Sequence, residues 1–336
     1  MATAVAVAPP PPRRRRLRPE TRLALLYVLP AFLVMGIITF YPLLFQTWMS
    51  FTDYTLENLP PRGVPPAFVG LDNYVRVLTT DLNLPNYDFV RIIVFNLWWA
   101  FSNVVIHVVL GVLIAVLLNR AGLRFRGFWR ALYIVPVVIP PIIVATVWAN
   151  MFDRDSGAIN LALQGVAALL RLPPETFQAD WLRQVQDPIP GLTFLPMAYF
   201  ALLIANTWLG WPLNSVVATG ALQSIPKELY EAAEMDGANS WQRFRTVTIP
   251  YLRPAMLPYA IYGFVITFNL FYLSYFMSGG GPFGKTELLV TQAFRLVTEQ
   301  RLYGVAAAFA VIMFFILLGL TLITNRVAKA TASYAD

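Results

Sequence analysis

Apolar residues along this chain are gathered into six long runs with polar stretches between them. A helix needs about 20 mostly apolar residues to cross a hydrocarbon core of about 30 Å. Runs of this length occur at approximately 23–49, 92–118, 131–152, 192–220, 251–277 and 303–324, and none of them contains a carboxylate. The pattern therefore predicts an all-α polytopic membrane protein with six transmembrane helices.

Lysine and arginine are distributed unevenly between the polar stretches. Most of them fall in residues 1–22, 119–130 and 221–250 and after residue 325. Because basic residues accumulate on the cytoplasmic side of a membrane protein, we expect both termini in the cytoplasm. The remaining polar stretches are then expected outside, at 51–91, 153–191 and 278–302.

The chain divides into three expected parts. Residues 1–22 combine a proline run with an arginine run and are too polar to pack, so they predict a disordered, basic cytoplasmic tail. The six-span domain follows at 23–327, and a short cytoplasmic tail at 328–336 completes the chain. The first apolar run is about twice as long as the core of a signal peptide, and we therefore expect it to be retained as a helix.

Composition supports a membrane protein and excludes several functions. The chain is 57% hydrophobic and 13% charged, against about 45–50% and about 25% in a soluble domain. It has no cysteine and one histidine, which excludes disulfides, thiol catalysis and multi-histidine metal sites. The net charge of +7 comes from scarce acids and a few basic clusters. These do not form the broad cationic face of a nucleic-acid-binding protein.

Two features resemble known functional sites, but their surroundings in the sequence favour a structural role. The segment from Gly279 to Thr286 matches the phosphate-binding pattern GxxxxGK[ST], but an apolar span precedes it and it lies on the expected outer side, so we interpret it as a glycine-rich turn. The single histidine, His107, lies in the middle of a span without a carboxylate. We expect it to hydrogen-bond Asn103, one turn earlier, and to hold helices together.

The loop between the fourth and fifth spans is much longer than a simple connection requires. Pro226 and Glu228 are typical of the first turn of a helix, and Gly237 is typical of its end. Asn239 or Ser240 would then cap a second short helix. Two short helices that meet at a glycine, on a charged cytoplasmic surface, predict a docking site for a partner protein.

The same loop, residues 221–250, resembles the signature of a known transporter family. Its spacing is similar to that of binding-protein-dependent ABC importer permeases at Glu231, Ala232, Ala233, Gly237, Val247, Ile249 and Pro250. The resemblance covers about residues 22–327 and is closest to the carbohydrate branch, in particular the larger maltose/maltodextrin type of subunit. The segments that carry this branch resemblance are 68–74, 206–210, 279–282 and 304–308.

The resemblance implies a type I ABC importer transmembrane domain that is driven by other chains. It implies a heterodimer with a second homologous permease subunit, two ATPase subunits that hydrolyse ATP–Mg, and an extracytoplasmic sugar-binding protein. The chain itself is expected to bind no cofactor. The spans agree, because an ion-coupled carrier normally needs ionisable groups at mid-membrane. The residues expected to couple to the ATPases are Glu231, Ala232, Ala233, Asp236, Gly237, Val247, Ile249 and Pro250.

Candidate substrate contacts lie in the fourth and fifth spans. Sugar recognition in a membrane requires uncharged hydrogen-bonding side chains and aromatic faces. Asn206, Gly210 and Leu213 share one face of the fourth span, and Asn269 lies one turn before Tyr272. The resemblance implies a mid-membrane sugar site, and the full set of candidates is Asn206, Leu209, Gly210, Leu213, Asn269 and Tyr272.

The identity of the sugar stays open at this point. Leu213 stands where the maltose pattern has an aromatic ring. Each asparagine could instead form an interhelical hydrogen bond. The nearby Trp208 and Trp211 could instead be packing or interface residues.

We therefore expect a subunit of a prokaryotic cell-membrane importer that takes up a sugar, such as maltose or maltodextrin, by alternating access. A permease for another neutral solute, of the glycerol phosphate or polyol type, is an alternative. Two further alternatives are an autonomous carrier or channel and a membrane-embedded enzyme. The enzyme would depend on the external aspartates Asp53, Asp72, Asp153 and Asp155.

Overall fold

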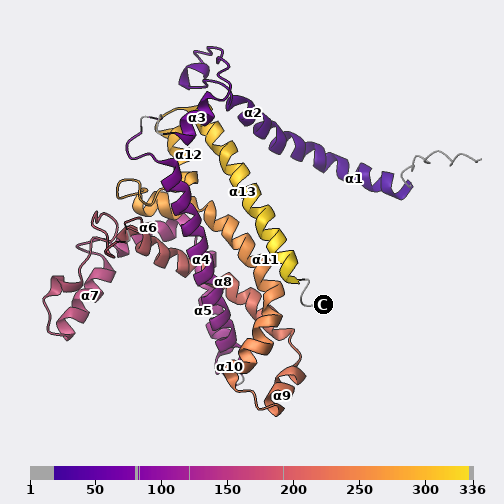
Figure 1. Cartoon of the computed structure of the whole chain (residues 1–336), viewed down its shortest axis with the longest axis vertical. Helices are drawn as coiled ribbons and strands as arrows, with labels where there is room; N and C mark the ends of the chain where they lie inside the picture. Colours follow the sequence, from indigo (N-terminus) through magenta and orange to yellow (C-terminus); the bar gives the residue numbers. More distant parts are fainter. Residues whose placement is uncertain (1–18, 80–81, 83, 121, 192, 333–336) are drawn as a thin grey trace, which may run out of the picture.

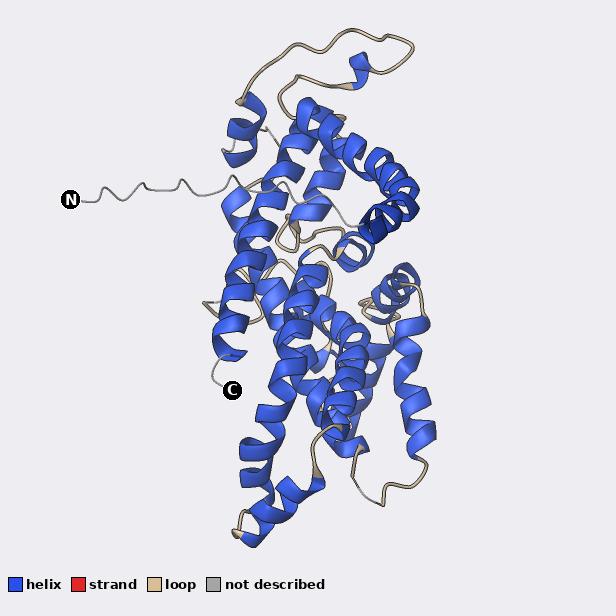
Figure 2. Ribbon diagram, turned by 90° about the vertical axis from the view of Figure 1, so that its right-hand side faces the viewer, coloured by secondary structure: helices blue, strands red, loops and turns tan. Residues whose placement is uncertain are grey.

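The computed structural model describes residues 19–79, 82, 84–120, 122–191 and 193–332 and, within these, the side chains of residues 23–326. The described part is built almost entirely from helices (Figures 1 and 2). Its one extended pairing is an isolated bridge between Thr52 and Phe68. The predicted all-α class is confirmed.

Helices cover each of the predicted apolar runs. In chain order the helical elements are α1 Pro19–Met35, η1 Gly36–Phe40, α2 Tyr41–Met49, η2 Leu56–Asn58, α3 Asp72–Leu78, α4 Phe89–Leu118, α5 Arg126–Val138, α6 Pro141–Met151, α7 Ala158–Leu169, η3 Pro174–Phe177, α8 Met197–Gln223, α9 Lys227–Met235, α10 Ser240–Arg243, η4 Phe244–Thr248, α11 Ile249–Phe268, η5 Leu273–Ser278, α12 Leu289–Thr298 and α13 Tyr303–Ala332.

Five helical segments within the described residues are long and apolar enough to cross a membrane, or six if the bent pair α5 and α6 is counted as one span. The predicted tails fall partly outside the description. Residues 1–18 and 333–336 are not described, α1 already begins at Pro19, and α13 continues to Ala332.

The third span differs from the single helix expected over 131–152. Its two halves, α5 and α6, meet at an angle of 95°. Ile139 and Pro140 both have extended backbone, with ψ values of 129° and 131°. A proline disfavours helical backbone in the residue before it and cannot supply the N–H that a continuous helix needs. The consecutive pair Pro140 and Pro141 therefore ends one helix and starts the next.

The fifth span begins earlier than expected and is broken near its end. One helical segment runs from Ser240 to Ser278, interrupted after Phe268 by Asn269 and Leu270. Fully buried Asn96, on α4, compensates for this break. Its Nδ2 donates to the carbonyl of Phe268 at 3.0 Å, and its Oδ1 accepts from the N–H of Leu289 at 2.8 Å. Irregular backbone at membrane depth requires such internal partners.

The helices α4 and α8 form the most extensive pair in the bundle. Gly111 allows their close approach, because a Cβ at this position would lie 2.5 Å from the Cβ of Asn214 and 2.9 Å from the backbone nitrogen of Ser215. In contrast, α1 projects away from the bundle (Figure 1), and the large apolar side chains of α1 are exposed. The core is therefore centred on α4 and α8.

Gly111→Ala tests this packing. The added methyl group forces apart two helices that have no room to adjust, and we expect a loss of about 1–3 kcal/mol of unfolding free energy. The matched control is Gly220→Ala on α8, where an added Cβ meets nothing within 4 Å. The melting temperatures of the two variants in detergent measure the effect. Equal melting temperatures would contradict the close contact at Gly111.

Candidate functional site

Asn206, the first candidate on the fourth span, is bound to a neighbouring helix. It lies on α8 with 4% of its surface exposed, and its Nδ2 donates to Oδ1 of Asn103 on α4 at 2.7 Å. The amide of Asn103 in turn donates to the carbonyl of Trp99 at 2.7 Å. Asn103 therefore pairs with Asn206, and the predicted bond between Asn103 and His107 is replaced by this pairing.

His107 fills the space beside Gly210. The ring is buried, with 6% of its surface exposed, and it is hydrogen-bonded to the backbone of Asn206. A Cβ on Gly210 would overlap the imidazole ring. Gly210 is one of the candidate substrate contacts, and in the structure the His107 ring lies against its backbone.

The remaining candidates on α8 differ in exposure. Leu209 is half-buried and packs against the apolar cluster between α4, α6 and α8. Leu213 is 42% exposed. The shared face expected from helical periodicity is therefore divided: Asn206 and Gly210 are covered by α4, while Leu213 is accessible.

Asn269 and Tyr272 lie at the break in the fifth span. Asn269 is half-buried, and its Nδ2 donates to the carbonyl of Val265 at 3.0 Å. Its Oδ1 accepts no hydrogen bond within the described chain. Tyr272 is 43% exposed. The break thus presents an acceptor and an aromatic ring that are accessible to a ligand.

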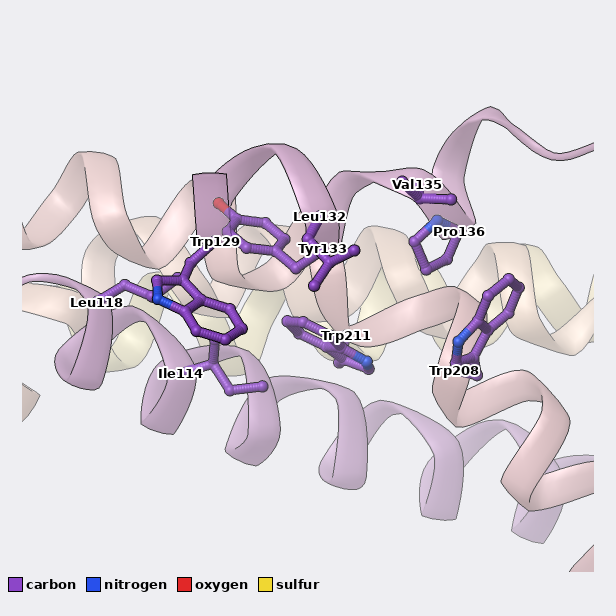
Figure 3. A pocket seen from close by; sticks show the side chains of 9 residues that line it. All are labelled: Ile114, Leu118, Trp129, Leu132, Tyr133, Val135, Pro136, Trp208 and Trp211. Atoms are coloured by element: carbon purple, nitrogen blue, oxygen red, sulfur yellow. The ribbon is translucent and has the colours of Figure 1, made fainter. Parts of the chain in front are cut away.

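Trp208 and Trp211 line a groove of about 450 Å³ between α4, α5 and α8. Figure 3 shows Trp129 and Tyr133 of α5 facing Trp211 of α8 across it. The ring centres of Tyr133 and Trp211 are 5.5 Å apart. The lining is almost entirely apolar and aromatic. Its hydrogen-bonding groups are limited to the Tyr133 hydroxyl and the indole N–H groups of the tryptophans, and none of the candidate substrate contacts lines it, so we separate it from them.

The loop between α8 and α11 folds as two short helices around Gly237. Lys227 is the first residue of α9, so Pro226 precedes the helix rather than lying in its first turn, whereas Glu228 is in that turn. Gly237 follows the end of α9 with φ +77°, a conformation that glycine adopts readily. Asn239 caps α10 through a reciprocal pair of bonds with Gln242, at 2.8 and 2.9 Å.

Two polar contacts stiffen this loop. Arg243 of α10 forms an ion pair with Glu234 of α9, with Nη1 and Oε2 2.7 Å apart. The hydroxyl groups of Tyr230 and Thr248 are 3.0 Å apart. Because α10 continues through η4 into α11, α9 is tied to the start of the fifth span.

The loop residues predicted to couple to a partner divide into exposed and supporting positions. Val247 is buried in the cluster between α4, α8, α9 and α11, and Ala233 is half-buried against it. Met235 and Trp241 are 88% and 67% exposed, although they are large and apolar. The predicted residues that are exposed are Glu231, Ala232, Asp236, Gly237, Ile249 and Pro250.

The glycine-rich segment is a turn between η5 and α12, as the sequence predicted. Gly280 has φ +74°, and a Cβ there would overlap the carboxylate of Glu287. Lys285 forms an ion pair with Asp187 at 3.0 Å, and Thr286 donates to the carbonyl of Gly281 at 2.6 Å. Burial raises the pKa of Glu287, and the nearby Arg295, whose Nε is 3.2 Å from Oε1 of Glu287, opposes that rise.

The aspartates of the loops that we expect outside take part in local turns. Oδ1 of Asp153 accepts from the N–H of Ser156 at 2.9 Å and from its hydroxyl at 2.7 Å, and these bonds lower the pKa of Asp153. Asp53 accepts from the N–H of Ala67 at 2.7 Å, and Asp72 lies in the first turn of α3. Asp155 is exposed and donates its backbone N–H to Oδ1 of Asp153 at 3.1 Å.

The sequence matches a described family over residues 107–332, the binding-protein-dependent transport system inner membrane component. The match extends from the second span to the sixth and includes the loop between the fourth and fifth spans. The chain belongs to this family. It is the permease subunit of an ABC importer and a multi-pass inner-membrane protein, as the loop signature predicted.

Individual relatives agree with this family. The permease is 29% identical over 310 residues to the galactooligosaccharides transport system permease protein GanP of Bacillus subtilis (strain 168), covering 90% of this chain and 69% of that protein. It is 30% identical over 311 residues to the trehalose/maltose transport system permease protein MalF of Thermococcus litoralis (strain ATCC 51850 / DSM 5473 / JCM 8560 / NS-C), covering 92% and 95%.

A solved structure shares the fold. A bacterial alginate ABC transporter, in complex with an alginate pentasaccharide-bound periplasmic protein, superposes on this chain with a TM-score of 0.71 at 18% identity. The superposition covers 93% of this chain and 96% of the other.

Sequence reasoning missed the role of Asn96 in the permease, and it gave Asn103 an interhelical role but with His107 instead of Asn206 as its partner. Asn96 and Asn103 lie on the buried side of α4, together with His107 and Gly111. The available signal was the spacing: three polar side chains and a glycine recur at intervals of seven, four and four residues along one face of an otherwise apolar span. Such a stripe favours interhelical contacts.

The contact of His107 with Gly210 can be tested by size exchange. Gly210→Ala introduces a methyl group into the space of the buried ring and should cost about 1–3 kcal/mol of unfolding free energy. His107→Ala removes the ring and so makes room for the added methyl group. Adding Gly210→Ala to His107→Ala should therefore cost less than half of the unfolding free energy that Gly210→Ala costs in the unmodified protein. Thermal unfolding in detergent measures all four proteins. Strictly additive effects would show that the two positions do not touch.

Proposed function

We propose that this permease imports a sugar, an oligosaccharide of the maltose or maltodextrin kind, by alternating access. The proposed partners are a second homologous permease, two ATPase subunits that hydrolyse ATP–Mg, and an extracytoplasmic binding protein, while this chain itself binds no cofactor. Similarity to permeases named for galactooligosaccharides and for trehalose/maltose supports a sugar substrate. The alginate transporter with its periplasmic protein supports a binding-protein partner.

The observation that carries this proposal is the stiff connection from α9 to the fifth span. An ATPase subunit would hold the exposed side of α9, including Glu231, Ala232 and Asp236. The ion pair of Arg243 with Glu234 would then transmit a movement of α9 to α10 and α11. The far end of α11 carries the break at Asn269. Closure of the ATPase pair can therefore change the environment of the substrate contacts without an ion gradient.

The proposal includes an orientation of the permease in the membrane, which follows from its basic residues. The end of the bundle with α9 would face the cytoplasm, together with both termini, because lysine and arginine are concentrated there. The loops that contain Asp153 and Glu287 would face outward and meet the binding protein.

The substrate contacts proposed for this subunit centre on accessible Leu213, Asn269 and Tyr272, with Asn206, Leu209 and Gly210 behind them. Asn269 offers an acceptor at the helix break, and Tyr272 an exposed ring. Leu213 supplies an apolar side chain where maltose permeases have an aromatic ring. This difference favours, as a second candidate, another small solute of the glycerol phosphate or polyol type.

Gly237→Val tests the coupling assignment. A β-branched residue at φ +77° is strained whatever space surrounds it, so the junction of α9 and α10 should distort. We expect at least a tenfold loss of ATP-driven maltodextrin uptake and of ATPase co-purification, with normal membrane insertion. Gly165→Val on α7, a glycine with open surroundings and no positive φ, should leave both unchanged. Survival of uptake and co-purification in Gly237→Val would refute the docking assignment.

Asn269→Ala tests the substrate contacts. Removal of a hydrogen-bonding partner for a bound sugar should lower kcat/KM for uptake about tenfold, since one such bond contributes about 1–2 kcal/mol. Asn150→Ala is the matched control, because Asn150 is exposed and makes the same bond to the carbonyl four residues earlier, at 2.9 Å. Uptake is measured with maltotriose, a galactooligosaccharide and glycerol. Uptake of glycerol alone would rule out the sugar assignment.

A further inference from the structure

The groove between α4, α5 and α8 has no role in the proposed transport path. It lies toward the end of the bundle that carries α9, because it is lined by Leu118 at the end of α4 and by Trp129 near the start of α5. Ile114, Tyr133 and Trp211 continue the lining. Figure 3 shows these side chains pointing into the same space. The groove is lined mainly by apolar and aromatic side chains, which suits a hydrocarbon chain.

A basic loop lies at the end of this groove. Residues 119–130 contain Arg120, Arg124, Arg126 and Arg130 and no acidic residue. Within the described part of the chain, none of these four arginines forms an ion pair. Arg126 donates to the carbonyl of Arg120 at 2.6 Å, which folds the loop back over the start of α5.

Two of the arginines have buried donors without partners. Nε of Arg126, and Nε and Nη2 of Arg130, are buried and make no hydrogen bond. An unsatisfied buried donor costs about 1–3 kcal/mol, and more when it is charged. Nη1 of each side chain is not among these buried atoms and forms no ion pair within the described chain, so it stays open to an acceptor from outside. A guanidinium selects phosphate or carboxylate oxygens through its planar fork.

The arginines and the aromatic rings occupy the same turns of α5. Arg126 and Arg130 are one turn apart, and so are Trp129 and Tyr133. Leu118 lines the groove only two residues before Arg120. The guanidinium groups of Arg126 and Arg130, which form no ion pair within the described chain, therefore lie near the end of the groove, at the depth where a span meets the aqueous phase.

We infer that this groove binds an anionic phospholipid, with an acyl chain along Trp129, Tyr133 and Trp211 and the phosphate on Arg126 and Arg130. A soluble anion would satisfy the arginines and leave the apolar groove exposed to lipid. A lipid with no net charge would fill the groove and leave most of the positive charge uncompensated. Basic sites between spans recognise anionic headgroups in this way. The bound lipid would hold α5 against α8, whose opposite side carries Asn206.

Lipid titration of the full chain, purified with any subunits that accompany it, tests this inference independently of the sugar. Phosphatidylglycerol and phosphatidylcholine with brominated acyl chains quench tryptophan fluorescence on contact. We expect saturable quenching by phosphatidylglycerol at a concentration at least about tenfold lower than for phosphatidylcholine. Trp211→Phe should remove part of this selective quenching, because Trp129 and Trp208 also line the groove, whereas Trp48→Phe, at an exposed position on α2, should leave the selective quenching unchanged.

Arg130→Gln measures the contribution of the headgroup site. We expect at least about a tenfold loss of phosphatidylglycerol affinity, because the buried guanidinium then no longer meets the phosphate. Arg124→Gln removes the same charge from an exposed position in the same loop and should change the affinity less than about threefold. Native mass spectrometry of the same samples counts the retained lipids.

Three results would overturn the inference. They are equal affinities for the two lipids, equal losses in Arg130→Gln and Arg124→Gln, and full displacement of the lipid by inorganic phosphate, which would indicate a simple anion site. If Arg130→Gln does not fold, the comparison of the two lipids on the unmodified chain and on Trp211→Phe still decides the question.

Discussion

Polar groups that enter the apolar depth of this bundle need partners inside the protein, because no water is available there to replace them. The buried face of α4 supplies many of these partners. Asn96 satisfies backbone groups at the break in the fifth span and at the start of α12. Asn103 and His107 bind Asn206 on α8, and Gly111 lets α4 and α8 approach closely enough for these bonds to form. The position of α8 thus depends on short-range contacts along a single helix face.

Breaks in the spans determine where aromatic and hydrogen-bonding side chains become accessible in the permease. Pro140 and Pro141 turn α6 by 95° away from α5, and α5 is left with an outer face that forms the aromatic groove. The break at Asn269 leaves an amide oxygen and the ring of Tyr272 accessible at the end of α11. A continuous helix would have used its backbone groups internally and presented a smooth apolar surface. The break after Phe268 is tolerated because the side chain of Asn96 compensates for it.

The loop around Gly237 connects these elements to the partner chains proposed to supply energy. Its geometry is local, since a positive φ at Gly237 and the reciprocal cap of Asn239 with Gln242 set the path between α9 and α10. Its rigidity depends on tertiary contacts, namely the ion pair of Arg243 with Glu234 and the burial of Val247. We expect the loop to pass a movement of α9 to the fifth span only when both the local geometry and the tertiary contacts are present.

The sequence by itself determined the helical class, the approximate spans, the caps of the loop and the family, because each depends on local composition or on spacing within a short segment. It did not determine that Asn206 and Gly210 face His107 and Asn103 while Leu213 is exposed, although all three α8 residues share one face of an ideal helix. That division depends on where α4 crosses α8, and the crossing is fixed by contacts between residues about one hundred positions apart. The same holds for Arg130, whose missing partner becomes visible only when its surroundings are folded.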